Sequence, residues 1–120
     1  MDYLRMLTLR RKKAHNKFLK MDSKVYKAFL DLESATYREG SLSIKVKELI
    51  AVGISAATNC ESCIQWHTEH AIKAGATQEE ILEALEVAIE IGGGHAIATA
   101  RLAFEVMDNL KSTDYESAEY

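Results

Sequence analysis

The 120-residue sequence predicts an all-α fold, and three observations support this. The chain contains no proline. It contains only six glycines, so few positions interrupt a helix. Val, Ile and Thr seldom alternate with polar residues, although that alternation is typical of strands. We therefore expect one domain over residues 1–120, a helical bundle of about five to six helices.

The first predicted helix, residues 3–20, is basic and carries only a weak apolar stripe: Leu4, Leu7, Leu9 and Phe18. Its run Arg10-Arg11-Lys12-Lys13 is compatible with a phosphate-binding patch. A solvated or subunit-facing helix surface is the simpler interpretation of such a run. We therefore assign no site to it.

The second predicted helix begins after Asp22 or Ser23. Gly40 is a natural C-terminal cap for it. Its apolar residues are expected to face inward: Val25, Phe29, Leu30 and Leu32.

A third helix is expected over residues 43–58, and it is apolar around most of its circumference after Glu48, which predicts burial. A carboxylate at the start of a buried helix needs a partner or a function. Glutamate near a helix N-terminus is also favourable by itself. From spacing alone, both interpretations of Glu48 stay open.

The fourth predicted helix carries both cysteines and ends at Gly75. Thr58 to Glu61 fits a capping box, and Asn59 is the alternative cap. On either assignment Cys60 and Cys63 lie in the first turns, where free N–H groups and the helix dipole favour a thiolate.

Residues 77–80, Thr-Gln-Glu-Glu, form a second capping box and open a fifth helix that ends at Gly92-Gly93-Gly94. A last helix, about 95–110, contains small residues that permit close helix approach: Ala96, Ala98, Ala100 and Ala103. The polar, acidic segment 112–120 is expected to be a loose tail.

The formal net charge of −3 favours neither nucleic acid nor a membrane as partner. No apolar run approaches the roughly 20 residues of a spanning helix, and the N-terminus lacks the apolar core of a signal peptide. We expect a cytoplasmic protein. Two cysteines only three apart are a poor disulfide framework for secretion, and indicate a catalytic or metal-binding pair.

Three chemistries suit the stretch from Cys60 to His67, beside a plain structural interpretation of two core cysteines and a surface histidine. Cys60, Cys63, His67 and His70 cannot all bind one zinc ion from a single helix. A helix rises about 1.5 Å per residue, so the first and the last of these residues lie roughly 15 Å apart, too far for one ion to bridge. A three-ligand site, or ligands from another chain, stays open. A cysteine-protease-like nucleophile would leave the second cysteine unexplained.

Dithiol–disulfide redox chemistry uses the whole set. Helical residues three apart have Cα separations that a disulfide tolerates, so Cys60 and Cys63 can cycle between dithiol and disulfide. His67 lies one turn after Cys63 and has an ordinary pKa near 6.5, which suits proton transfer near neutral pH. Which cysteine attacks stays open, since exposure favours Cys63 and the helix N-terminus favours Cys60.

The sequence resembles the alkylhydroperoxidase D-like branch of the carboxymuconolactone decarboxylase-like superfamily. The resemblance rests on Glu48, eleven intervening residues and then Cys60-x-x-Cys63-x-x-x-His67. The stretch 71–77, Ala-Ile-Lys-Ala-Gly-Ala-Thr, and Glu79-Glu80-Ile81 support it. It covers a core of about 25–110.

This resemblance implies an all-α protein that assembles as trimers or hexamers, with its thiols in a cleft near the subunit contacts. It implies thiol-dependent reduction of hydroperoxides, or reduction of a partner peroxiredoxin, with electrons from a lipoyl-type or other dithiol donor. Cys60 and Cys63 would be the redox pair, and Glu48 and His67 a proton relay. No cofactor and no metal are implied.

Two departures matter. The best-known alkylhydroperoxidase D proteins carry two copies of the helical unit, whereas this chain has one, so self-association is expected to replace the second. The lactone decarboxylases of the superfamily lack the cysteine pair, so a lyase is a weaker alternative. A redox-sensing or scaffold protein without efficient turnover is another. We expect Trp66 and His70 to be pocket or interface residues, and His95 a helix-start residue.

Overall fold

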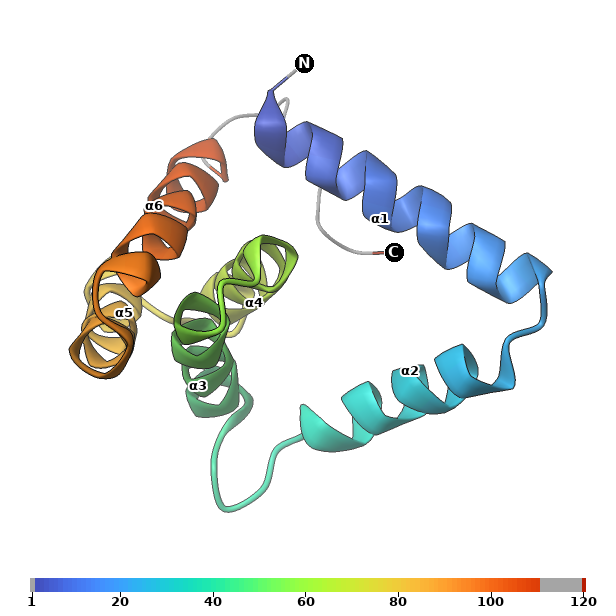
Figure 1. Cartoon of the computed structure of the whole chain (residues 1–120). Helices are drawn as coiled ribbons and strands as arrows, with labels where there is room; N and C mark the ends of the chain where they lie inside the picture. Colours follow the sequence, from blue (N-terminus) through green and yellow to red (C-terminus); the bar gives the residue numbers. More distant parts are fainter. Residues whose placement is uncertain (1, 111–119) are drawn as a thin grey trace.

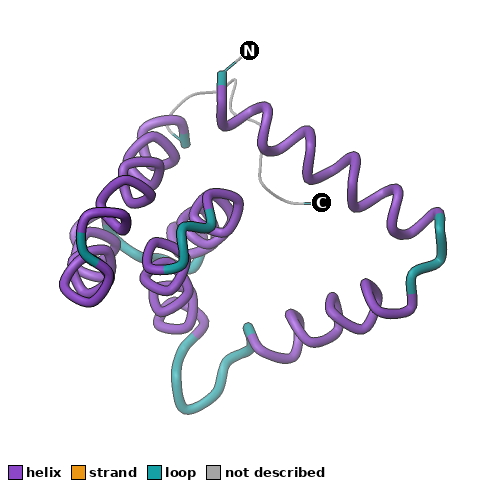
Figure 2. The backbone as a smooth tube through the Cα atoms, viewed as in Figure 1, coloured by secondary structure: helices purple, strands orange, loops and turns teal. Residues whose placement is uncertain are grey.

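The computed structural model describes residues 2–110 and residue 120. Six helices and no strand occur in this part of the chain, so the predicted all-α class is confirmed (Figures 1 and 2). In chain order they are α1 (Tyr3–Lys20), α2 (Lys24–Thr36), α3 (Ile44–Ala57), α4 (Glu61–Lys73), α5 (Gln78–Gly92) and α6 (Gly94–Asn109). The longest connection between them is residues 37–43, between α2 and α3 (Figure 2).

Local capping explains several helix starts. The Ser23 hydroxyl accepts a hydrogen bond from the Tyr26 N–H, which confirms a second helix beginning after residue 23. Thr77 and Glu80 form both bonds of the predicted capping box at the start of α5. Such bonds satisfy N–H groups that a helix cannot satisfy itself. These boundaries therefore follow from neighbouring residues alone.

Helices α3 to α6 form the core. Its largest fully buried apolar side chains include Val52 on α3, Ile64 on α4, Ile81 on α5 and Val106 on α6. Gly53 lets α3 approach α5 closely, because a Cβ at this position would lie 3.3 Å from the Ala84 carbonyl oxygen. The small residues expected on α6 are buried at positions 96, 100 and 103, whereas residue 98 is exposed.

Helix α1 is attached to α4 by a buried polar contact. The Gln65 amide donates to the Leu4 carbonyl oxygen over 3.0 Å and to the Thr8 hydroxyl over 2.8 Å. Arg11 donates to the Gln65 side-chain oxygen over 3.1 Å. Leu4, Thr8 and Gln65 are all buried. Of the predicted stripe on this helix, Leu4 is buried in the core and Leu7 packs against it, while Leu9 and Phe18 stay exposed.

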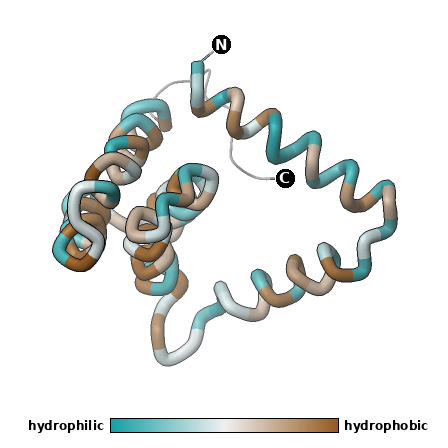
Figure 3. Tube along the Cα trace, viewed as in Figure 1, coloured by the Kyte–Doolittle hydropathy of each residue, from teal (hydrophilic) through white to brown (hydrophobic). Residues whose placement is uncertain are grey.

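Helix α2 contradicts the prediction that its apolar residues face inward. It has no buried residue, and Val25, Phe29 and Leu32 are 83%, 55% and 61% exposed. Figure 1 shows α1 and α2 extending away from the group α3–α6, and apolar segments of α2 are visible in Figure 3. The helix carries the apolar pattern, but no part of the chain that the structure describes covers Val25, Phe29 and Leu32.

Two further predictions need correction, and a third concerns residues that the structure does not describe. Gly40 does not cap α2, which ends at Thr36 with Tyr37 as its cap, because that turn needs no left-handed glycine. Helix α3 is buried on one side only, since Ile50 and Ile54 are exposed. Of the predicted loose tail, residues 112–119 lie outside the described residues. Among the described helices, none is long and apolar enough to span a bilayer.

Candidate functional site

Cys60 and Cys63 form a disulfide at the start of α4, with their Cα atoms 5.2 Å apart. Cys60 is the N-terminal cap of the helix, and its Sγ accepts the N–H of Cys63 over 3.3 Å. The capping predictions for Thr58 and Asn59 are wrong. Thr58 instead ends α3, and its hydroxyl donates to the Ile54 carbonyl oxygen over 2.8 Å. A reduced Cys60 would keep this N–H, which favours the thiolate form.

The turn before the cysteines is fixed by α6. Asn59 has a φ of 57°, a left-handed conformation that asparagine tolerates better than most residues. Its side-chain oxygen accepts a 2.6 Å hydrogen bond from the Thr99 hydroxyl. His95 Nε2 donates to the Ala57 carbonyl oxygen over 3.3 Å. His95 lies at the start of α6, as expected, and with Thr99 it positions the approach to Cys60.

Glu48 and His67 meet across α3 and α4. Nδ1 of His67 is 2.7 Å from Oε2 of Glu48, and the Glu48 side chain is only 4% exposed. With Glu48 ionised, Nδ1–H donates to the carboxylate and the other ring nitrogen, Nε2, is left for proton exchange. Glu48 thus has a partner, as expected for a carboxylate at the start of a buried helix. A favourable position near the helix N-terminus was the other interpretation that the spacing left open. The structure places the two proton-transfer candidates together, and places His67 one turn beyond Cys63.

Glu33 and Tyr37, near the C-terminal end of α2, also lie close to this pair, and sequence reasoning missed both. The Tyr37 ring lies 5.3 Å from the His67 ring. Burial raises the pKa of Tyr37, and the negative charges of Glu48 and Glu33 act in the same direction. Burial also raises the pKa of Glu33, while the nearby His67 and His70 oppose this shift. No motif marks Glu33 or Tyr37, because α2 reaches α4 only through tertiary structure.

An aromatic cluster lies beside this pair on α4. Trp66 stacks on His70 with ring centroids 4.4 Å apart, and Tyr120 lies 4.7 Å from Trp66. His70 Nδ1 donates to the Trp66 carbonyl oxygen over 2.7 Å. The Arg11 guanidinium lies 5.3 Å from the Trp66 ring, within range of a cation–π contact. Burial raises the pKa of Tyr120 to about 12.

A polar hollow of about 690 Å³ opens beside Glu48. Tyr37, Glu48 and His70 line it, and Lys45 and Lys73 lie at its wall. Each of these lysines is paired with a carboxylate, Lys45 with Glu80 and Lys73 with Glu69. His70, expected to be a pocket or interface residue, therefore lines the hollow that reaches the Glu48–His67 pair.

A zinc site is the alternative use of these cysteines and histidines. Within residues 2–110 and 120, no three His, Cys, Asp or Glu side chains come close enough to bind one metal ion. The described arrangement instead combines a reversible disulfide with a buried carboxylate–imidazole pair. Chemically, such a site can exchange a disulfide with a thiol and move the protons that the exchange requires.

Comparisons with known proteins agree with the all-α fold and with the family that the sequence resembles. The family model of the carboxymuconolactone decarboxylase family matches residues 23–106. The chain is 41% identical over 83 residues to uncharacterized protein 4 in the cox locus of Paracoccus denitrificans. The matched stretch covers 69% of this chain and 75% of that protein.

Two solved structures have the same fold. A carboxymuconolactone decarboxylase family protein from Legionella pneumophila, in its apo form, has a TM-score of 0.86 at 32% identity, covering 93% of this chain and 100% of that one. A protein of the same family from Thermotoga maritima has a TM-score of 0.79 at 32% identity, covering 89% and 92%. The latter is named as a candidate for a role in an antioxidative response.

Proposed function

The chain belongs to the carboxymuconolactone decarboxylase family, and from this premise we propose that it is a thiol-dependent peroxidase or disulfide reductase. Cys60 and Cys63 are the redox pair, and Glu48 with His67 transfers protons. The 2.7 Å contact between Glu48 and His67, on the helix that begins with the cysteines, is the observation that carries this proposal. A buried carboxylate held on an imidazole is a costly arrangement, and proton transfer gives it a purpose.

The oxidative half-reaction consumes one hydroperoxide. One cysteine thiolate attacks a peroxide oxygen, the O–O bond breaks, and a sulfenic acid and an alkoxide form. The alkoxide takes a proton, which His67 is placed to supply, and leaves as an alcohol. The second cysteine then attacks the sulfenic sulfur, releasing water and forming the Cys60–Cys63 disulfide.

The reductive half-reaction returns the two electrons. A dithiol donor of the lipoyl type attacks the disulfide, forms a mixed disulfide and then closes its own disulfide, which leaves Cys60 and Cys63 reduced. A partner peroxiredoxin is an alternative substrate, because reduction of its disulfide follows the same exchange. The polar hollow beside Glu48 supports this scheme, because it gives protons a route between the Glu48–His67 pair and solvent. We expect a reducing compartment, the cytoplasm, to supply such donors.

Two other functions remain distinguishable. A redox-sensing or scaffold protein would use the same disulfide once per molecule, without turnover. A lactone decarboxylase-like lyase would act without the thiols. The cysteine pair favours the peroxidase over the lyase, because decarboxylation has no use for a disulfide.

The test measures hydroperoxide consumption with a dihydrolipoyl-type donor by wild type, Cys60→Ser and Cys63→Ser. Ser62→Ala is the matched control, since Ser62 is exposed between the two cysteines. We expect turnover by wild type and the control and none by the cysteine variants, with free thiols counted before and after. Consumption of about one equivalent by wild type would identify a sensor. Equal rates in all four proteins would refute the redox site.

A further inference from the structure

Tyr120 contacts aromatic residues of three helices, although it lies outside the described helices itself. Its ring stacks on His15 of α1, with the ring centroids 4.2 Å apart and the planes 11° from parallel. It also lies 4.7 Å from the Trp66 ring of α4, and its hydroxyl is hydrogen-bonded to that of Tyr26 on α2. Figure 1 shows residue 120 in the space that α1, α2 and α4 surround. We call His15, Tyr26 and Trp66 the aromatic site.

The three residues of the aromatic site are held in place by contacts other than those with Tyr120. Nδ1 of His15 lies 2.6 Å from the Tyr26 hydroxyl, and the two rings meet edge to face with centroids 5.5 Å apart. On α4, Trp66 stacks on His70 with centroids 4.4 Å apart. The walls of the site are therefore positioned without the ring that fills it.

Tyr120 fills the aromatic site without being buried in the core, since it is 46% exposed. A free molecule with the same ring and hydroxyl could make the same stacking and hydrogen-bonding contacts. Burial raises the pKa of Tyr120 to about 12, and the negative charge of Glu33 acts in the same direction. The surroundings therefore favour a neutral hydroxyl over a phenolate.

The aromatic site adjoins the residues of the candidate redox site. Trp66 lies one turn after Cys63 on the same face of α4, and His67 lies on this face as well. Glu33 acts electrostatically on both Tyr120 and His67. A ring bound in the aromatic site would thus lie on the side of α4 that carries the cysteine and the imidazole.

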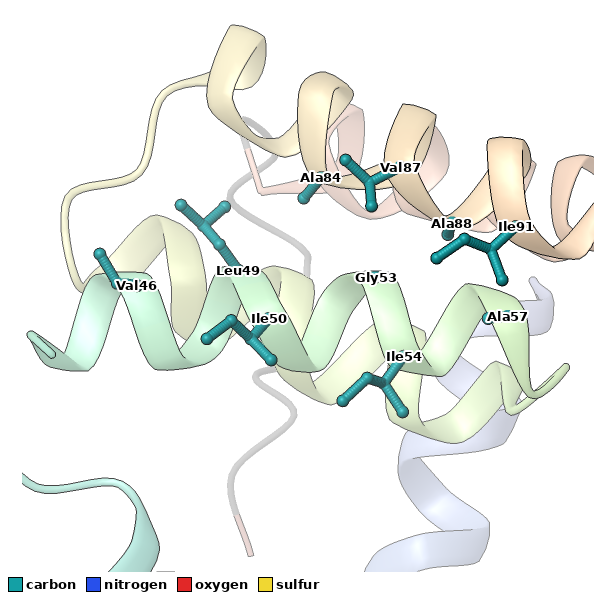
Figure 4. A pocket seen from close by; sticks show the side chains of 10 residues that line it. All are labelled: Val46, Leu49, Ile50, Gly53, Ile54, Ala57, Ala84, Val87, Ala88 and Ile91. Atoms are coloured by element: carbon teal, nitrogen blue, oxygen red, sulfur yellow. The ribbon is translucent and has the colours of Figure 1, made fainter.

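The groove between α3 and α5 is another place where an apolar ring could bind. Its volume is about 370 Å³, and Figure 4 shows side chains of both helices around it, among them Ile54 and Ile91. Every residue that lines it is aliphatic or glycine, so it offers a ring no aromatic face to stack on and no side-chain hydrogen bond. The aromatic site offers both.

We propose that the aromatic site binds a small neutral aromatic molecule, a phenol or a similar planar ring with one hydroxyl group, and that Tyr120 fills the site in its absence. The ligand ring stacks on His15 and Trp66, and its hydroxyl bonds to that of Tyr26. This inference does not rest on the proposed peroxidase activity, because binding needs no turnover.

The probe is p-cresol, which is the tyrosine side chain as a free molecule. Trp66 is the one tryptophan of the sequence, so its fluorescence, excited where p-cresol does not absorb, reports on this site. Tyr120 competes with p-cresol, and its removal raises the fraction of molecules whose site is empty. Tyr120→Ala should therefore bind p-cresol about tenfold more tightly than wild type in a fluorescence titration.

Second changes in the Tyr120→Ala chain test the walls of the site. His15→Leu removes one stacking face and should abolish the gain in affinity, whereas Tyr26→Phe keeps the ring, loses the hydroxyl and should weaken binding severalfold. Ile54→Ala, in the α3–α5 groove, is the matched control and should change nothing. Circular dichroism checks folding, and His15→Gln replaces His15→Leu if that variant unfolds.

A ligand control separates stacking from general hydrophobic binding. The molecule 4-methylcyclohexanol has about the size of p-cresol and the same hydroxyl but no aromatic ring, so it should bind severalfold more weakly.

Four results would overturn the proposal. If Tyr120→Ala binds p-cresol no more tightly than wild type, Tyr120 does not occupy a ligand site. If the His15 variant keeps the gain, the ring binds elsewhere, and a loss of binding in Ile54→Ala would place it in the α3–α5 groove. Equal affinity for 4-methylcyclohexanol would mean that the site does not recognise aromatic rings.

Discussion

Nδ1 of His67 and Oε2 of Glu48 lie 2.7 Å apart, although 19 residues separate them in the chain. The carboxylate orients the imidazole, because the contact holds Nδ1 against Glu48 and both side chains are largely buried. This contact joins α3 to α4 one turn beyond Cys63.

Glu48→Gln keeps the shape of the side chain but removes its charge. If the pair transfers protons, the rate of hydroperoxide reduction should fall on the order of 10²-fold, the scale of one general acid–base group. The measurement is kcat/KM between pH 6 and 9, with thermal melting as a check on folding. Glu105→Gln, an exposed change on α6, is the control. An unchanged rate and pH profile would remove Glu48 from the relay.

Asn59 tests how far the left-handed turn supports the cysteine helix. Asn59→Gly and Asn59→Ala both lose the hydrogen bond from Thr99, but only alanine must hold a Cβ at a φ of 57°. The alanine variant should be less stable than the glycine variant by about 1 kcal/mol. Urea unfolding of the two proteins measures the difference. Equal stability would mean that the turn changes conformation.

Gln65 tests the attachment of α1. Gln65→Leu removes the bonds to Leu4 and Thr8 and leaves buried polar groups without this partner, at a cost of about 1–3 kcal/mol. We expect a lower urea midpoint and faster proteolytic cleavage within α1, since that helix carries seven basic residues for trypsin. Gln78→Leu, at an exposed position at the start of α5, should change neither. Cleavage at the wild-type rate would show that other contacts hold α1.

Glu33 predicts a pH dependence of stability. Burial raises the pKa of this carboxyl above its ordinary value of 4.5, with His67 and His70 opposing the shift and Glu48 adding to it. The folded protein therefore holds this proton to a higher pH than the unfolded chain, and the group lowers stability as the pH rises through its folded pKa. Glu33→Gln should raise the melting temperature at pH 7.

The advantage of Glu33→Gln should shrink as the pH falls from the raised pKa toward 4.5, and it should be lost below about 4.5, where the wild-type carboxyl is neutral in both states. Melting curves of both proteins from pH 4 to 8 provide the test, with Glu105→Gln as the control. A variant that is less stable than wild type at pH 7, or a difference that is the same at every pH, would contradict the prediction.

Residues close together in the sequence predict the all-α class and several helix starts of this protein. The Thr77–Glu80 capping box, the Ser23 cap and the all-α class depend on residues within a few positions of each other, so local pattern was enough. The Cys60–Cys63 spacing likewise permits a disulfide within one helical turn. Features that depend only on neighbouring residues can be predicted from the sequence.

The other features of the site depend on contacts between distant parts of the chain. Cys60 became the cap in place of Thr58 and Asn59 because the α3 end and the contact from Thr99 fix the turn before it. Glu33 and Tyr37 reached His67 through the placement of α2, which no local pattern encodes. The apolar pattern of α2 predicted an inward face, whereas Val25, Phe29 and Leu32 are exposed in the described chain, because a local pattern does not specify the surface that would cover it.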